Sequence, residues 1–181
     1  KKFYLRAPKR CLRQTIKQGG RTILRLKKRE PTTDAEIAGL VTTLKHWWAA
    51  VTGSMNMYLF RKDGVLPILP RKYIRLPKLG EQPEVIWEET EGEFLAGDIL
   101  ILMTKPLALT LSQPRIANLL STSLYEKKPV ADMVKFLLQD AKQRRSGDYG
   151  VLLLHKPIDT LPYHPKRPSV LARKGWGFSY V

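Results

Sequence analysis

Cysteine is nearly absent from this chain of 181 residues: Cys11 is the only one, so no internal disulfide can form and a reducing environment is favoured. Long apolar runs are also lacking. The longest, ILILM, ends before Thr104-Lys105, far short of the roughly 20 residues that a membrane-spanning helix needs. The opening KKFYLRAPKR contains no apolar signal core. These absences predict an intracellular, cytoplasmic protein without a transmembrane segment.

Disorder is excluded by composition, because hydrophobic residues make up 43% and aromatic residues 9% of the chain. Its length fits one domain, or one domain with an extended tail. The chain does not begin with Met, which leaves open a processed form or a fragment that lacks N-terminal residues.

Acidic residues are scarce: 16 Asp or Glu stand against 32 Lys or Arg, for a net charge of +16. Residues 1–30 hold twelve of the basic residues and one acid, Glu30, and so carry +11 of that charge. This segment predicts a polyanionic partner such as RNA, whereas the alternative is a solvated basic face. The candidate polyanion-binding residues are Lys9, Arg10, Arg13, Lys17, Arg21, Arg25, Lys27, Lys28 and Arg29.

The sign of the charge reverses in residues 81–100, which hold seven Asp or Glu and no Lys or Arg. This acidic block could pair internally with the N-terminal basic segment or with a second basic cluster in residues 61–78. The chain contains no zinc-ligand spacing, no aromatic RNA-binding signature and no glycine-rich phosphate loop.

Apolar spacing predicts a short basic helix over residues 8–18, which ends at Gly19-Gly20. The next segment, residues 21–30, fits either a helix or an edge strand. Residues 33–64 also permit two structures. One is a helix, and the other is a set of strands with a Lys45-His46 turn and an Asp63-Gly64 turn.

Prolines 67, 70, 77 and 83 predict a loop after this region. Two strands follow, VIWEET and DILILMT, separated by a Glu91-Gly92 turn, and the second is apolar enough for burial on both faces. Ser112-Gln113-Pro114 opens a predicted helix, Pro129 begins a longer amphipathic helix that Ser146-Gly147 ends, and YGVLLLH reads as a short buried strand.

The C-terminal residues 156–181 contain four prolines between 157 and 168, which predict an extended linker. In the final GWGFSYV, Trp176, Phe178 and Tyr180 would share one side of an extended chain. We expect this strand to dock on a sheet edge, either of this chain or of a partner protein.

The order of four pieces, VTGSMNMYLFRKDG, GEFLAGDILILMT, two predicted helices and SGDYGVLLLH, resembles a known family. It is similar to the C-terminal two-thirds of a PPM-type (type 2C) metal-dependent protein phosphatase domain, over about residues 35–155. That family shows Gly-Asp-Ser, Tyr-Leu-x-Arg and Asp-Gly, then Pro-Gly-Asp, an apolar strand, Thr-Asp-Gly, paired helices and Asp-Asn. The matching residues are Gly53, Tyr58, Leu59, Arg61, Asp63, Gly64, Gly97, Asp98, Thr104 and Asp148. The resemblance favours strands over residues 36–61.

Several departures from the family pattern affect its metal ligands. The family binds two divalent metals through carboxylates and attacks a phosphoester with metal-activated water. Here Lys105-Pro106 replaces Asp-Gly, Ser54 replaces the Asp of Gly-Asp-Ser, and Tyr149 replaces the Asn after Asp148. An ammonium group repels a hard cation and offers it no lone pair. We therefore expect no catalytic residue and no cofactor, with Asp148 as a weak metal candidate and Mg or Mn the alternative if the enzyme is active.

Other candidates for chemistry are weaker. His46, His155 and His164 have no ligand spacing, and Cys11 lies among basic residues without a recognisable base partner. Strand alternation would direct one of Trp47 and Trp48 inward and the other outward, as packing residues. We propose no catalytic triad.

The sequence therefore predicts an α+β layered sandwich of the PPM phosphatase type, incomplete at its N-terminal edge, with a basic N-terminal helix and an extended C-terminal tail. The family's early strand pair, with its Asp-Gly-Met-Gly-Gly turn, has no counterpart before residue 35. The expected division is a basic segment (1–34), a phosphatase-like domain (35–155), and a proline-rich linker with an aromatic docking strand (156–181). The function expected first is a catalytically degenerate binding or structural module. The alternatives are a basic RNA-binding component of a ribonucleoprotein and an active phosphatase with unusual ligands.

Overall fold

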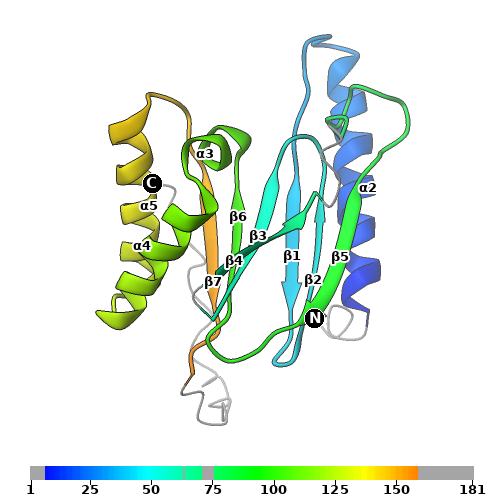
Figure 1. The fold of residues 1–181 in the computed structure, drawn as a ribbon. Coiled ribbons are helices and arrows are strands. Elements are labelled where there is room, and N and C mark those ends of the chain that lie inside the picture. The colour runs from blue at the N-terminus through cyan, green and yellow to red at the C-terminus, as the bar shows by residue number, and fades with distance from the viewer. Residues whose placement is uncertain (1–6, 63, 71–75, 159–181) are drawn as a thin grey trace, which may run out of the picture.

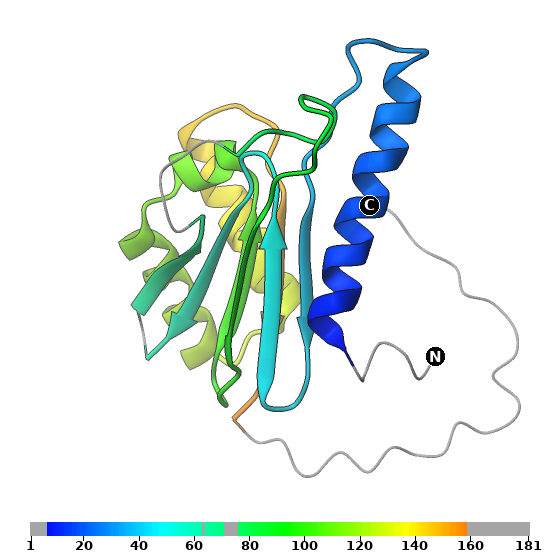
Figure 2. The same cartoon turned by 90° about the vertical axis from the view of Figure 1, so that its right-hand side faces the viewer.

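The computed structural model describes residues 7–62, 64–70 and 76–158. Its elements form four layers: helices α3, α4 and α5 cover one sheet, a second sheet packs on the first, and α2 covers the second sheet (Figure 1). In the turned view, α2 stands on the side of the sandwich opposite to α4 and α5 (Figure 2). The elements in chain order are α2 (Pro8–Lys27), β1 (Ala38–Thr42), β2 (His46–Val51), β3 (Asn56–Arg61), β4 (Gly64–Leu69), β5 (Glu88–Glu93), β6 (Ile99–Met103), α3 (Lys105–Thr110), α4 (Gln113–Tyr125), α5 (Val130–Arg144) and β7 (Val151–His155).

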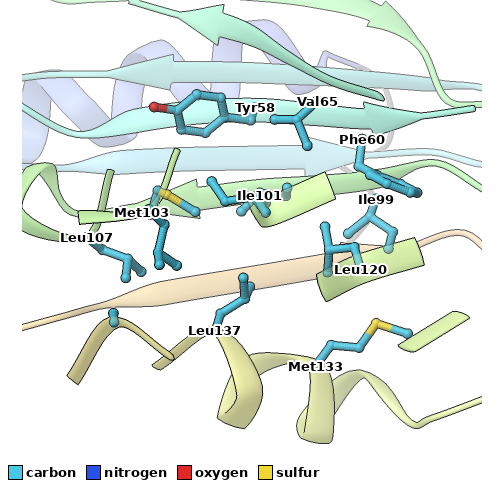
Figure 3. Close-up of a cluster of buried hydrophobic side chains, with 13 residues drawn as sticks. Tyr58, Phe60, Val65, Ile99, Ile101, Met103, Leu107, Leu120, Met133 and Leu137 are labelled. Atoms are coloured by element: carbon cyan, nitrogen blue, oxygen red, sulfur yellow. The ribbon is translucent and has the colours of Figure 1, made fainter. Parts of the chain in front are cut away.

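The two sheets are antiparallel throughout their described pairings. One has the strand order β4-β3-β6-β7, and the other has the order β1-β2-β5. Because side chains alternate along a strand, β6 contributes side chains to the apolar cores on both faces of its sheet. Its residues 99, 101 and 103 pack towards α4 and α5 (Figure 3). Residues 100 and 102 face the other sheet. All five β6 residues are buried, as predicted.

Helix α2 runs without a break from Pro8 to Lys27, so the predicted end at Gly19-Gly20 is wrong. The segment left open after it is helical. A Cβ atom on Gly20 would collide with Val85, and one on Gly19 would lie 2.7 Å from Cδ1 of Ile37. The two glycines therefore allow close packing of the helix on its neighbours and do not stop it.

The strands expected over residues 36–61 are confirmed as β1, β2 and β3. The first turn lies one residue earlier than predicted, because His46 already pairs with Glu93 of β5. Trp47 is buried between the sheets, and Trp48, which alternation directs the other way, packs under α2.

The predicted Glu91-Gly92 turn is wrong, since both residues lie within β5. Gly92 pairs with Trp47, and a Cβ atom at Gly92 would lie 2.7 Å from Cζ2 of that indole. The glycine therefore makes room for the tryptophan ring. Residues 94–98 then carry the chain from one sheet to the other.

The loop predicted from its prolines begins with a strand, β4, which contains Pro67. Pro67 is tolerated because β4 lies at the edge of its sheet among the described strands. Helix α3 was not predicted. Strand β7 is also an edge strand, and Leu152 is 53% exposed, so the prediction of a buried strand was too simple.

The described residues contain no helix that is long and apolar enough to cross a membrane. The predicted docking strand, with Trp176, Phe178 and Tyr180, lies outside the described residues, as does most of the proline-rich linker.

Candidate functional site

A cavity of about 610 Å³ opens at the end of the sandwich where β2 and β6 end and β3 and β7 begin. Segments far apart in sequence meet there: residue 36, the β2–β3 turn, residue 78, the start of α3 and the α5–β7 loop. The strands bring these segments together because the loops that connect antiparallel strands lie at the ends of the sandwich, here at the same end.

The β2–β3 turn forms one wall of the cavity. Gly53 has φ +65, a left-handed conformation that favours glycine, and its N–H donates to the carbonyl of Pro77 at 3.1 Å. The hydroxyl of Ser54 donates to Oε1 of Glu36 at 2.7 Å. The turn is thereby fixed to the segment before β1, and the Glu36 carboxylate is held at the cavity.

The opposite wall joins the end of β6 to the loop before β7. The N–H of Thr104 donates to the carbonyl of Gly150 at 3.0 Å, and the N–H of Gly150 donates to the Thr104 hydroxyl at 3.1 Å. The Tyr149 hydroxyl donates to the carbonyl of Arg145 at 2.7 Å, which fixes the curve of the loop. This pairing places Lys105 and the α5–β7 loop on the same rim.

The charges that line the cavity are mixed. Lys78 pairs with Asp34 at 3.1 Å, and this hydrogen bond raises the pKa of Lys78. Within the described residues, the side chains of Lys105, Arg145 and Asp148 have no hydrogen bond or ion pair. The cavity therefore presents two cations and one carboxylate that are free to meet a ligand.

Asp148, the weak metal candidate, lies in the exposed α5–β7 loop and lines the cavity. Glu36 supplies the second carboxylate of the lining. No group of three His, Cys, Asp or Glu side chains that could hold a metal ion occurs among the described residues. Sequence reasoning missed Glu36, Lys78 and Arg145, because no local motif marks them and only the fold brings them to the cavity.

The nine candidate polyanion-binding residues fall into two groups. Lys9 lies 3.4 Å from Glu91, and Arg13 donates through Nε to Glu89 at 2.7 Å. Lys27 donates to the carbonyl of Gly80 at 2.5 Å, and Lys17 lies 5.7 Å from the centre of the Trp87 ring. The other five are exposed and have no hydrogen bond or ion pair within the described residues. They are Arg10, Arg21, Arg25, Lys28 and Arg29.

The predicted internal pairing of the acidic block is confirmed by these contacts. Arg13 and Trp87 both donate to Glu89, and the Arg13 hydrogen bond is the main reason why the pKa of Glu89 is lowered to about 2. At the sheet crossover, Arg61 donates to both oxygens of Asp98, which is 1% exposed.

The histidines form no ligand cluster in the described part of the chain. His46 lies at the start of β2, 5.9 Å from Trp48 between ring centres. His155 ends β7, where burial lowers its pKa, and its Nε2 has no hydrogen-bond partner among the described residues. His164 lies outside them.

No protein-family model matches the sequence, and no curated protein matches it. Solved structures do match the fold. The serine/threonine phosphatase of S. agalactiae superposes with a TM-score of 0.67 at 17% identity, covering 78% of this chain and 68% of that one. The phosphatase Stp1 of Staphylococcus aureus gives 0.69 at 15% identity, covering 81% and 66%. The catalytic domain of the phosphatase PstP in complex with two manganese ions gives 0.60 at 18% identity, covering 75% and 65%.

The expectation of no cofactor is contradicted by these neighbours, because the PstP domain of the same fold holds two manganese ions. The donor set of this chain's cavity nevertheless differs from that of a two-metal centre. By the resemblance described above, Lys105 and Ser54 fall where the family pattern has aspartates. Glu36 and Asp148 are the two carboxylates among the described lining residues, and Glu36 is engaged by Ser54. These residues do not fit a pair of divalent ions.

The comparisons cover about two-thirds of the length of each matched phosphatase. Their α+β layers correspond to the two sheets and flanking helices described above. This chain has the fold of the PPM-type serine/threonine phosphatases.

Proposed function

We propose that this PPM-type domain is catalytically degenerate and acts as a binding module through the cavity at the end of its sandwich. The observation that supports this proposal is the position of Lys105, which lines the cavity. Lys105 is the first residue of α3 and follows Thr104, the residue after the end of β6. Hydrolysis by this fold needs carboxylates to hold the metal that activates water. An ammonium group at such a position opposes both the metal charge and its ligation.

The proposal concerns turnover and not the presence of an ion. The two free cations, Arg145 and Lys105, outnumber the one free carboxylate, Asp148, so we expect an anionic ligand. A ligand held by direct ammonium and guanidinium contacts needs no activated water. The chemistry of the lining thus favours binding over hydrolysis.

Turnover of p-nitrophenyl phosphate tests this function in the whole chain, with and without Mn²⁺. We expect no rate above background for the native chain. Manganese-dependent turnover that is lost in Asp148→Ala would instead establish an active phosphatase with unusual ligands.

A matched pair of variants sharpens the test. Lys105→Asp restores a carboxylate at the cavity, whereas Lys142→Asp makes the same charge change on the exposed part of α5, outside the lining. We expect calorimetry to show tighter Mn²⁺ binding for Lys105→Asp only. Equal binding by both variants would show that Lys105 does not govern the site.

A second function is favoured by the charge of the N-terminal helix. Helix α2 contains no acidic residue, and several of its cations make no internal pair in the described structure. We infer that the chain also binds polyanions, as an RNA-binding component of a larger assembly would. If four to five phosphates are neutralised, affinity should fall roughly 10²- to 10³-fold between 50 and 200 mM salt, measured by fluorescence anisotropy. Binding that does not change with salt would refute this function.

A further inference from the structure

Four cations of the α2 segment lie on one line along the outer face of the helix. Arg10, Arg21, Arg25 and Lys28 are separated by eleven, four and three residues, which are close to whole turns of a helix with about 3.6 residues per turn. All four are exposed, and none has a hydrogen bond or ion pair within the described residues. At about 1.5 Å per residue, this outer stripe is roughly 27 Å long.

The cations on the flank of the helix next to β5 are already neutralised. Arg13 is held by Glu89, and Lys9 lies within 3.7 Å of Glu89 and 3.4 Å of Glu91. These acids lie on β5, and the pairs attach the helix to the sheet. The fold therefore divides the basic residues of one helix into an anchoring set and the outer stripe.

The apolar face of α2 is not available to a membrane. Leu12 and Ile16 are buried against the second sheet together with Ala50, and Gly20 is buried beside Val85. A membrane-surface helix inserts its apolar face between lipid headgroups. Because these residues are covered here, the surface that α2 offers an acidic lipid is mainly the charged stripe, with Leu26, 45% exposed, as its exposed large apolar side chain.

The composition of the stripe favours contact with phosphates over contact with bases. The exposed residues between its cations include Gln14 and Gln18, which can donate to phosphate oxygens, and helix α2 contains no aromatic residue. Proteins that hold single strands use aromatic side chains on which bases stack. A straight, convex row of cations suits the regular backbone of a duplex.

On these grounds we propose that the outer stripe of α2 is a docking surface for the phosphate backbone of a nucleic-acid duplex. The inference rests on the second proposed function, polyanion binding, and specifies its surface and its partner. Recognition is independent of base sequence, because the stripe offers charge and amide donors and no base-reading pocket. Duplex DNA and duplex RNA present the same chemistry, and the experiment distinguishes them.

Two double variants of the whole chain provide the test, since each removes two positive charges from the same helix. Arg21→Gln with Arg25→Gln alters the stripe, whereas Lys9→Gln with Arg13→Gln alters the anchoring set. Binding to 20-base-pair DNA and RNA duplexes is measured by fluorescence anisotropy across a salt series. The stripe variant should lower the slope of log affinity against log salt by about 1.8, at about 0.9 per lost phosphate contact. The anchoring variant should leave the slope unchanged.

The fold of each variant is checked by circular dichroism and thermal unfolding. The stripe variant should unfold like the native chain, so that its loss of binding is not a loss of structure. An equal fall in slope for both variants, or no fall for either, would overturn the docking surface while leaving polyanion binding intact. Failure of the native chain to bind any polyanionic probe, whether duplex, single strand or anionic vesicle, would overturn polyanion binding itself.

Two further probes separate the partners. A polyuridine single strand should bind more weakly than either duplex, and vesicles of phosphatidylcholine with 30% phosphatidylserine should bind more weakly still. Tighter binding to the single strand or to the vesicles would overturn the assignment to a duplex. A preference between the DNA and RNA duplexes, with both slopes lowered by the stripe variant, would support the surface and identify the source of the phosphates.

Discussion

The two helical layers of this sandwich are held to their sheets by different interactions. Helices α4 and α5 share a large apolar core with β3 and β6, in which Leu137 is fully buried (Figure 3). Helix α2 buries only Leu12 and Ile16 as large apolar side chains and adds ion pairs from Lys9 and Arg13 to β5. The α4–α5 layer is thus attached mainly by packing, and the α2 layer by a narrow contact and by charge.

This difference shows how one fold can keep one layer for stability and leave the other for binding. A helix that needs only a narrow apolar stripe has most of its circumference free for charged residues. In the α4–α5 layer, by contrast, Asp140 pairs with Arg115 and Arg144, which links the two helices to one another. The hydrogen bond from Arg115 lowers the pKa of Asp140.

Truncation of the larger core should have the greatest effect. Leu137→Ala is expected to lower the free energy of unfolding by about 2–5 kcal/mol, because a cavity opens under α5. Leu12→Ala, the same change in the α2 layer, should fall at the lower end of that range. Denaturant unfolding measures both. If Leu12→Ala proved the more damaging, the packing contrast between the layers would be wrong.

The second largest loss of stability is expected where α2 approaches the loop before β5 closely. Gly20→Ala places a methyl group against Val85, and such overpacking costs about 1–3 kcal/mol, of which the higher helix propensity of alanine offsets about 1. The net result should be destabilisation, measured as a lower thermal midpoint. Gln18→Ala, on the exposed side of the same helix, is the control and should not lower it. A higher thermal midpoint for the Gly20→Ala variant would show that α2 can shift away from Val85 without loss of stability.

The pair between Arg13 and Glu89 should make the stability of the α2 layer depend on pH. The pKa of Glu89 is lowered from 4.5 to about 2, so the folded state favours the ionised form more than the unfolded state does. Its contribution is fully present above about pH 4.5 and is lost as the pH falls through about 2. Glu89→Gln should remove this contribution to the pH dependence of the free energy of unfolding.

The measurement is urea unfolding of the native chain and of Glu89→Gln between pH 2 and 6, at low and at high salt. Because Arg13 is exposed, the difference between the two proteins should shrink at high salt. Glu93→Gln, on the same strand and without a side-chain pair to α2 in the described structure, serves as the control. Parallel curves for the native chain and Glu89→Gln would exclude the pair as an anchor.

The smallest effect on stability is expected from the outer stripe. Arg21→Gln with Arg25→Gln should change the free energy of unfolding by no more than about 0.5 kcal/mol, because neither side chain has a partner within the described residues. Lys9→Gln with Arg13→Gln should cost more. Urea unfolding of both double variants under the same conditions measures the two losses. A larger loss for the stripe variant than for the Lys9/Arg13 variant would contradict the division of the α2 cations into an anchoring set and an outer stripe.

Strands β6 and β7 could be predicted from their apolar runs, whereas the strands over residues 36–61 were favoured over a helix by the family resemblance. The run from Ile99 to Met103 is apolar at every position, and it became the strand buried on both faces. The errors arose where a small residue served packing. Gly19-Gly20 resembles a helix end, and Gly92 resembles a turn, but each makes room for a side chain from a distant part of the chain.

The candidate site was less accessible to sequence reasoning. Lys105 and Asp148 could be singled out because they lie in segments that resemble family motifs. Glu36, Lys78 and Arg145 could not, since no motif assigns any of them to a site, although Lys78 ends the second basic cluster. Their convergence depends on strand register and on the packing of one sheet on the other, which no local pattern encodes.

By itself, the sequence determined the excess of positive charge at the N-terminus, the apolar runs that became β6 and β7, and the lysine in the segment that resembles the family's Thr-Asp-Gly motif. These are properties of residue type and of short-range spacing. Only the tertiary structure decided which cations are neutralised by β5 and which face outward, and which side chains share the cavity. The reason is that ion pairs and cavities depend on distances between segments far apart in the chain, and packing sets those distances.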